Sequence, residues 1–364
     1  MKSILPAQST RRQFIATAGS AICSAPFVLS AQKTESRKIV GDGEHQFEVI
    51  HDWLKLPDQF TWQTTHNVAV DQNGSIYVIH EGHRDQADHP SIFVFDSNGQ
   101  YIRSFGSEYQ GGGHGLEIRT EGNEQFLYVT AYKHLKRFAK LTLTGELVWE
   151  RRAPMVSERY AECEAEQPRG NWGRNRFMPT NFAFHPDGGF YVADGYGAYC
   201  IHRYDKDANY QSTIGRPGKG PGEFQLPHGV WLDSRNEGAP TLVVADRVNA
   251  RLQWFSLDGK HLSTVDGFIL PANVDTHKDL MVVPDLSARV TLLNKKNEIV
   301  AHLGEDSDWR TEVLKDNRKL RTEPDRWRDG RFLHPHDACF DLSGNIIVAE
   351  YVSTGRVTLL KRLA

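Results

Sequence analysis

The chain has 364 residues, of which 39% are hydrophobic, and a formal net charge of −3 at pH 7. A chain of this length and composition can bury a large core in one or two domains, which excludes a disordered protein. No basic tract dominates the charge pattern, which argues against a nucleic-acid-binding protein. No apolar run after the N-terminal segment reaches the ~18 residues that a membrane-spanning helix requires.

The N-terminal segment, residues 1–31, resembles a twin-arginine export signal. Arg11 and Arg12 are followed by Phe14, an apolar stretch of modest length and an exit of small residues. We therefore expect the twin-arginine export machinery to be one partner of this chain, and the mature protein to be periplasmic or secreted. Residues 32–46 are expected to form a linker.

One sequence pattern recurs six times after this linker. Each copy has a short polar head, a strand that ends near Asp, a turn with Gly and a second strand that ends in an acidic or polar residue; two further strands follow. The copies occupy residues 65–82, 113–132, 179–196, 227–247, 271–287 and 335–351. Four antiparallel strands in each of six repeats predict an all-β fold, a six-bladed β-propeller over residues 47–364.

The last repeat has sequence for only three strands before the chain ends at Ala364. The segment 47–53, FEVIHDW, lies before the first repeat and can supply the missing outer strand, which would close the ring. Two insertions interrupt the repeats, at residues 154–176 and 305–331. The second is expected to be partly helical as far as Pro324, and to form either a solvated face or a lid over one end of the propeller.

Histidine recurs at one position of the repeat. The six copies carry there, in order, His66, His114, Thr180, His228, Ala272 and His336. The first strand of every propeller blade lines the central channel, so we expect the four imidazoles to converge. Confined imidazoles repel one another when protonated, and binding a divalent metal ion in the neutral form relieves this repulsion. Three histidines with an open position are typical of a catalytic zinc site. The alternative is that each histidine is a hydrogen-bonded polar residue at a strand start.

A second set of equivalent positions lies at the end of the next strand. It holds His80, Ala131, Asp194, Asp246, Asp285 and Glu350. Acidic residues at such positions commonly bind backbone amides or neighbouring arginines, so we expect these residues, and Arg251 with them, to be mainly structural.

Three cysteines follow the export signal, at Cys163, Cys200 and Cys339. No CxxC spacing links them, which excludes a zinc site built from thiolates. An oxidising compartment would permit one disulfide, for which Cys163 and Cys200 are the expected pair.

Several motifs resemble those of the peptidyl-α-hydroxyglycine α-amidating lyases, which belong to the NHL-repeat propellers. The resemblance covers nearly all of residues 60–363, and its specific pieces are GHGL (113–116), PTNFAFHPDGGFYVADGY (179–196), LPHG (226–229) and PHD (335–337). It implies a zinc-dependent carbon–nitrogen lyase that acts on an α-hydroxylated amide or a related small molecule or peptide. The implied zinc ligands are His114, His228 and His336.

The same resemblance implies roles for three further residues. Tyr196 corresponds to the catalytic tyrosine of that family, Arg247 to an active-site arginine, and Asp337 to a side chain at a structural calcium ion. Arg247 is expected either to help lower the pKa of Tyr196 or to bind a substrate carboxylate. The sequence departs from the family in its first repeat. There, His66 adds a fourth imidazole, a candidate fourth ligand or proton carrier, and Glu81 occupies the region of a further arginine.

Two other functions fit the same repeats. A non-catalytic NHL-repeat propeller would bind a protein or glycan through one rim, and bulky side chains would fill its channel. A lactonase-type sugar hydrolase would hold calcium with Glu, Asn and Asp, and the histidine-rich channel argues against it. The plain alternative for Tyr196 is an aromatic filler of the channel, and for Arg247 a partner of Asp246 or Asp285.

Overall fold

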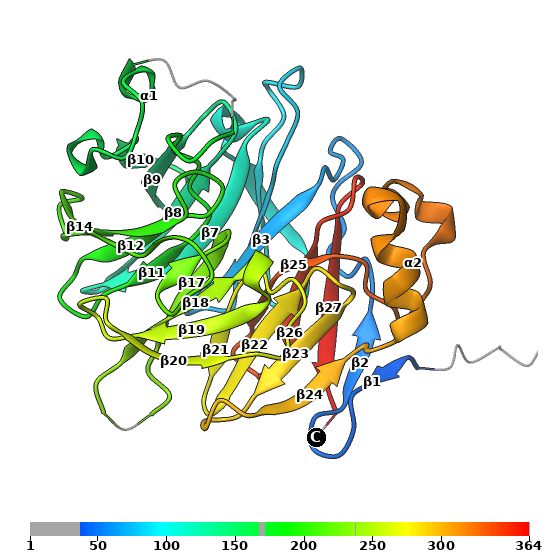
Figure 1. The fold of residues 1–364 in the computed structure, drawn as a ribbon. Coiled ribbons are helices and arrows are strands. Elements are labelled where there is room, and N and C mark those ends of the chain that lie inside the picture. The colour runs from blue at the N-terminus through cyan, green and yellow to red at the C-terminus, as the bar shows by residue number, and fades with distance from the viewer. Residues whose placement is uncertain (1–36, 167–171, 237, 364) are drawn as a thin grey trace, which may run out of the picture. The chain divides into compact units, whose positions relative to one another are not determined.

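The computed structural model describes residues 37–166, 172–236 and 238–363, and the predicted export signal lies outside these ranges. Within them, six antiparallel sheets follow one another along the chain as blades (Figure 1). Five of the sheets have four strands and the sixth has five. The predicted six-bladed β-propeller is confirmed.

Blades 1 to 3 each contain four consecutive strands. Blade 1 comprises β3 (Thr65–Val70), β4 (Ile76–His80), β5 (Ile92–Phe95) and β6 (Tyr101–Phe105). Blade 2 comprises β7 (Gly113–Glu121), β8 (Glu124–Ala131), β9 (Arg137–Thr142) and β10 (Leu147–Arg151). Blade 3 comprises β11 (Phe182–Phe184), β12 (Phe190–Asp194), β13 (Cys200–Tyr204) and β14 (Tyr210–Ile214).

Blades 4 to 6 repeat this order, after a short parallel pair formed by β15 (Arg216–Pro217) and β16 (Glu223–Phe224). Blade 4 comprises β17 (Pro227–Asp233), β18 (Thr241–Asp246), β19 (Arg251–Phe255) and β20 (His261–Val265). Blade 5 comprises β21 (Asp275–His277), β22 (Leu280–Asp285), β23 (Arg289–Leu293) and β24 (Ile299–Leu303). Blade 6 comprises β25 (Pro335–Phe340), β26 (Ile346–Glu350), β27 (Arg356–Arg362), β2 (Phe47–Ile50) and β1 (Ile39–Val40).

The helices of the described residues are short. The α-helices are α1 (Cys163–Glu166) and α2 (Ser307–Arg318). The 3-10 helices are η1 (Ser107–Tyr109), η2 (Met155–Ser157), η3 (Arg247–Asn249), η4 (Lys319–Thr322) and η5 (Pro324–Arg326). In this part of the chain, no helix combines the length and the hydropathy of a membrane span.

The N-terminal strand β2 closes the ring, as the sequence predicted. It pairs antiparallel with β27, so that Phe47 lies opposite Arg362 and Val49 opposite Leu360. Phe47, Val49 and Leu360 are buried together in the core between blades 5 and 6. Strand β1 then pairs with β2 on its outer side. Closure therefore combines backbone hydrogen bonds with burial of apolar side chains.

The hydrophobic core is divided among the blade interfaces. Each of the six pairs of neighbouring blades shares one cluster of buried side chains. Strand β18 shows how one strand serves two interfaces, because successive side chains of a strand point to opposite faces. Leu242 and Val244 pack toward blade 3, whereas Val243 and Ala245 pack toward blade 5. Burial on both faces explains why these second strands are continuously hydrophobic in sequence.

The acidic residues at the ends of the second strands hold the segments that lead into each blade. Each carboxylate accepts a hydrogen bond of 2.7–2.8 Å from a backbone N–H before the first strand. The pairs are Asp194 with Met178, Asp246 with Gln225, Asp285 with Ile269, and Glu350 with Leu333. Arginines of the third strands pair with three of them, including Arg251 with Asp246 at 2.9 Å. These contacts agree with the structural role that we expected for the acidic residues at the second set of equivalent positions.

The expected disulfide between Cys163 and Cys200 was wrong, because both thiols are free. Cys163 accepts a hydrogen bond from Arg176 Nη1 at 2.5 Å. The Cys200 thiol is buried and lies 3.6 Å from His202 Nε2. The two sulfur atoms therefore face different partners.

The second insertion is helical in its first part, as predicted. Helix α2 is capped by the Asp306 carboxylate, which accepts a hydrogen bond from Trp309 N at 2.9 Å. Trp309 and Val313 are buried in an apolar cluster with loop residues of blades 5 and 6. The helix ends earlier than the predicted stop at Pro324, in a run of left-handed residues with φ of 49°, 55° and 63°, namely Asp316, Asn317 and Arg318.

One prediction concerns the pH dependence of stability. Burial lowers the pKa of His202 from 6.5 to about 3. The folded protein thus binds fewer protons there than the unfolded chain, so the contribution of His202 to stability is complete above pH 6.5 and is lost as the pH falls toward 3. Between pH 7 and pH 5, we expect the His202→Gln variant to lose about 2 kcal/mol less stability than the wild type, measured by urea unfolding. Equal losses in the two proteins would contradict this prediction.

Candidate metal centre in the channel

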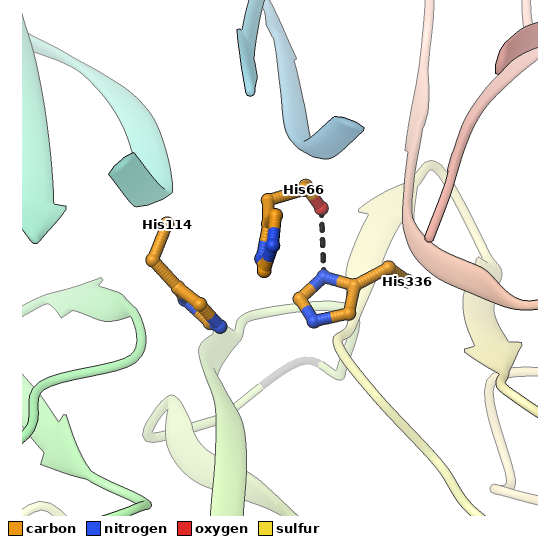
Figure 2. A group of neighbouring side chains, drawn as sticks. All are labelled: His66, His114 and His336. Carbon is orange, nitrogen blue, oxygen red and sulfur yellow. Dashed lines mark hydrogen bonds between the residues drawn. The ribbon is translucent and has the colours of Figure 1, made fainter. Parts of the chain in front are cut away.

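All four histidines of the shared repeat position converge in the channel, as the sequence predicted. They are buried, and the centroids of neighbouring rings lie 4.5–4.8 Å apart. One nitrogen from each of His66, His114 and His336 lies within 4.8 Å of the others (Figure 2). The Nε2 atoms of His114 and His228 are 3.1 Å apart.

Three of these histidines lie on alternate blades and share one hydrogen-bond pattern. The Nδ1 atoms of His114, His228 and His336 lie 2.7–2.9 Å from a main-chain carbonyl oxygen of the next blade. The acceptors are the residues at the equivalent repeat position, Thr180, Ala272 and His66 respectively. Figure 2 shows the contact that His336 makes. A carbonyl oxygen only accepts, so each Nδ1 carries the proton and each Nε2 keeps its lone pair.

Glycine follows two of these histidines for a steric reason. A Cβ atom at Gly115 would lie 2.2 Å from the carbonyl oxygen of Thr180. A Cβ atom at Gly229 would lie 2.8 Å from the carbonyl oxygen of Ala272. These are the oxygens that bind Nδ1 of His114 and His228. The missing side chains therefore let the next blade approach closely enough to fix the imidazoles.

The three alternate-blade histidines fit a zinc ion. Burial, and then the repulsion that a protonated ring would meet from neighbouring imidazoles and Arg247, lowers the pKa of each well below 6.5, so the imidazoles are neutral. Neutral imidazole is the form that binds a metal ion, and a carbonyl at the opposite nitrogen is the usual outer partner of such a ligand. Three nitrogen donors of this kind match the ligand set of catalytic zinc.

His66, in blade 1, has different partners. Its Nε2 lies 3.3 Å from Glu81 Oε2, and its Nδ1 has no hydrogen-bond partner among the described residues. Glu81 also accepts hydrogen bonds from Tyr132 Oη at 2.6 Å and from Lys133. Burial opposes ionisation of Glu81, but His66 and Lys133 outweigh it and hold the pKa of this carboxyl well below its usual value. His66 is therefore tied to a carboxylate instead of a next-blade carbonyl.

Tyr196 and Arg247 lie beside the histidines. Tyr196 Oη is 2.9 Å from His228 Nε2 and 3.3 Å from His114 Nε2. Arg247 Nη1 donates a hydrogen bond to Tyr196 Oη at 3.3 Å. Burial raises the pKa of Tyr196, and the charge of Arg247 offsets only part of this effect. Arg247 forms no salt bridge with any described residue, and its expected alternative partners, Asp246 and Asp285, pair with other arginines.

Asp337 lies in an oxygen-rich layer next to the histidines. The repeat position that follows the histidine position carries an asparagine in blades 1, 3 and 5, namely Asn67, Asn181 and Asn273. Asn273 Nδ2 donates to Asp337 Oδ1 at 2.6 Å, and Asn181 Nδ2 donates to Glu117 Oε1 at 2.9 Å.

The acceptors of this layer are incompletely satisfied. The amide oxygens of all three asparagines are buried without a donor in the described part of the chain. Burial raises the pKa of Asp337 to about 6 and that of Glu117 well above its usual value. Buried oxygen atoms that lack donors suit a calcium ion. These asparagines were not predicted as site residues, although their recurrence at one repeat position could have indicated a shared site.

A cavity of about 530 Å³ opens onto the site. Much of its wall comes from residues that follow the second strands, namely Tyr132, Tyr196, Arg247, Leu286 and Tyr351. His336 lies in its wall, and Arg318 reaches it from the second insertion. Tyr132 and Tyr351 were not predicted from the sequence, although they directly follow the second set of equivalent positions. Arg318 was not predicted either, because it lies outside the repeat and carries no repeat signal.

Comparisons with known proteins agree with this fold. A family model described as a 6-bladed beta-propeller matches residues 183–279. The chain is 28% identical to NHL repeat-containing protein 3 of Homo sapiens over 214 residues, which cover 57% of the chain and 55% of that protein. It is 25% identical to the peptidylglycine alpha-amidating monooxygenase of Rattus norvegicus over 245 residues, which cover 60% of the chain and 23% of that protein. The chain thus spans about half the length of the first relative and about a quarter of the second.

Solved structures show the same architecture. Virginiamycin B lyase from Staphylococcus aureus superposes with a TM-score of 0.52 at 11% identity, covering 87% of this chain and all of that one. A protein of unknown function from Bacteroides thetaiotaomicron has a TM-score of 0.53 at 11% identity, and the match covers 82% of this chain and 70% of that one. The chain is a six-bladed β-propeller. Two of the curated relatives that it matches, from Homo sapiens and Mus musculus, are NHL repeat-containing proteins.

A second prediction tests the close contact at Gly229. A methyl group there would lie 2.4 Å from Asn273 Cα, so blades 4 and 5 would have to separate. We expect Gly229→Ala to destabilise the protein by about 1–3 kcal/mol in urea unfolding, the usual cost of overpacking. The matched control is Gly220→Ala, whose methyl group would meet only the Glu223 side chain, and we expect it to change stability by less than about 0.5 kcal/mol. Wild-type stability of Gly229→Ala would contradict the prediction.

Proposed function

We propose that this protein is an exported zinc-dependent lyase that cleaves a C–N bond of an α-hydroxylated amide or a related small molecule or peptide. One observation carries the proposal: three neutral histidines from alternate blades meet beside a tyrosine hydroxyl at the base of a cavity. The partial similarity to peptidylglycine alpha-amidating monooxygenase supports the lyase chemistry. The twin-arginine-like N-terminus supports a periplasmic or secreted location.

His114, His228 and His336 would hold the zinc ion. Bound there, the ion would supply Lewis-acid stabilisation of negative charge on a substrate oxygen. His66 would stay outside the ligand set, because its Nε2 faces Glu81 and it lacks the next-blade carbonyl partner that orients each of the other three histidines. Asp337 and the asparagines of the oxygen-rich layer would hold a structural calcium ion.

The reaction needs one proton moved between two substrate atoms. As the C–N bond breaks, its electron pair goes to nitrogen, and the electrons of the O–H bond complete a new C=O bond. The hydroxyl proton therefore has to leave the oxygen, and the nitrogen has to gain a proton, which gives a carbonyl compound and a free amide. Tyr196 is placed to move this proton, and Arg247 orients the tyrosine hydroxyl through its 3.3 Å hydrogen bond. The arginine charge would also stabilise negative charge that develops on the reacting oxygen.

The ligand assignment makes a third prediction. The wild-type protein should contain about one equivalent of zinc after gel filtration, measured by elemental analysis. His114→Ala, His228→Ala and His336→Ala should each lose most of it, because each removes one of three equivalent donors. His66→Ala is the matched control from the same cluster and should retain zinc. If His66→Ala lost zinc and His228→Ala kept it, the ligands would instead be His66, His114 and His336. Less than about half an equivalent in the wild type would refute the metal centre.

The role of Tyr196 makes a fourth prediction. Tyr196→Phe removes the hydroxyl but keeps the ring, so we expect at least about a hundredfold lower kcat with zinc content unchanged. The assay is release of glyoxylate from N-acyl-α-hydroxyglycines. Tyr101→Phe, on outer strand β6, is the control and should keep wild-type activity. Comparable activity of the Tyr196 and Tyr101 variants would remove Tyr196 from the mechanism.

A non-catalytic propeller that binds a protein or glycan is the second candidate. The similarity to NHL repeat-containing protein 3 favours it as much as the other similarity favours the lyase. The two candidates differ in what the channel histidines do. Partner binding that survives His228→Ala, in a protein that lacks zinc and activity, would favour the non-catalytic candidate.

A further inference from the structure

The cavity above the histidines carries an excess of positive charge. Arg247, Arg318 and Lys133 line it, and no aspartate or glutamate of the described residues does. Lys133 is neutralised by its ion pair with Glu81. The two arginines form no salt bridge within the part of the chain that the structure describes. Two arginines therefore line one cavity without a carboxylate counter-ion among the described residues.

Arg247 has unused hydrogen-bonding capacity although only 6% of the residue is exposed. Its Nη1 donates to Tyr196 Oη and its Nε to the carbonyl oxygen of Pro271, whereas its Nη2 has no partner among the described residues. A buried cation with an unpaired N–H is costly, and a bound anion removes that cost.

Arg318 reaches the same cavity from the second insertion. It is the last of three successive left-handed residues at the C-terminal end of α2, directly before η4. Such backbone is strained and persists where the surroundings hold it. Here Trp309 and Leu320 are buried on either side of the run, in one apolar cluster. The side chain of Arg318 has no hydrogen bond in the described structure, and its charge adds to the effect of burial in lowering the pKa of Arg247.

The rest of the cavity wall is mainly apolar or aromatic. It contains Tyr132, Trp172, Leu226, Val248, Leu270, Leu286 and Tyr351. A ligand that fits such a wall has an apolar body and an anionic group. The planar fork of a guanidinium matches a carboxylate through two parallel hydrogen bonds.

We propose that Arg318, carried by the insertion 305–331, acts with the free Nη2 of Arg247 as a carboxylate clamp, so that the protein selects carboxylic acids with an apolar substituent. This inference rests on the proposed function, because it names the substrate class of the same site. The insertion is then a specificity element, because α2 (Figure 1) is anchored by Trp309 and Val313 in an apolar cluster and carries Arg318 at its C-terminal end.

Two probes of equal size, one charged and one uncharged, test the clamp. Binding of 3-phenylpropionate and of 3-phenylpropionamide to the full chain is measured by isothermal titration calorimetry. We expect the wild type to bind the carboxylate at least about tenfold more tightly than the amide. Arg318→Gln should lose most of this preference while binding the amide as before. Lys315→Gln removes a charge from the same insertion at a side chain that is 63% exposed, and it should keep the preference.

The outcomes separate this inference from the proposed function. Equal affinity of the wild type for both probes, or binding of neither, would overturn the clamp, as would a full preference in a folded Arg318→Gln variant. If that variant does not fold, Arg318→Lys replaces it, with a partial loss expected because the charge stays and the fork is lost. The titrations are repeated with His228→Ala. A preference that persists there supports the clamp even if the wild type proves to lack zinc or lyase activity. Loss of the clamp in a zinc-containing active enzyme would leave the proposed function standing.

Discussion

Pairing of β2 with β27 closes the ring, and every feature of the channel depends on that closure. The seam between the ends of the chain runs through the site itself, because His336 of blade 6 donates a hydrogen bond to the carbonyl oxygen of His66 in blade 1. Val68 N also donates to Asp337 across the same seam, at 2.8 Å. An open blade 6 would leave β27 as an unpaired edge and would expose the apolar cores on both sides. The geometry of the candidate metal centre is therefore a property of the whole ring.

The six repeats divide the channel into layers of different chemistry. In the first layer, the histidines that contact a next-blade carbonyl lie in blades 2, 4 and 6, with His66 as a further imidazole in blade 1. In the next layer, the asparagine amide oxygens lie in blades 1, 3 and 5. This alternation gives each layer an approximate threefold arrangement within a sixfold fold. It also explains the neighbours of the histidines: Gly115 and Gly229 make room for the carbonyl groups that orient His114 and His228. One repeat unit thus serves a nitrogen-rich and an oxygen-rich site through small substitutions at two positions.

The sequence predicted those parts that follow the repeat. The blade count, the closing strand and the convergence of His66, His114, His228 and His336 all follow from counting equivalent positions. The asparagines at the next position are equally in phase with the repeat, but they were not predicted as site residues. Features that depend on distances between side chains could not be predicted from the sequence. The different partners of the Cys163 and Cys200 thiols and the contact of His66 with Glu81 are set by the three-dimensional fold. Arg318 lies in an insertion without any periodicity.

The alternate-blade arrangement also determines when, during synthesis and folding, the three histidines can come together. The three nitrogen atoms come from the second, fourth and sixth blades, so the donor face does not exist until the C-terminal repeat has left the ribosome and packed against the first. An emerging chain offers only isolated imidazoles, which hold metal ions weakly. Uptake of a metal ion at the candidate site would therefore follow translation, and the ion captured would reflect its availability in the compartment where folding finishes.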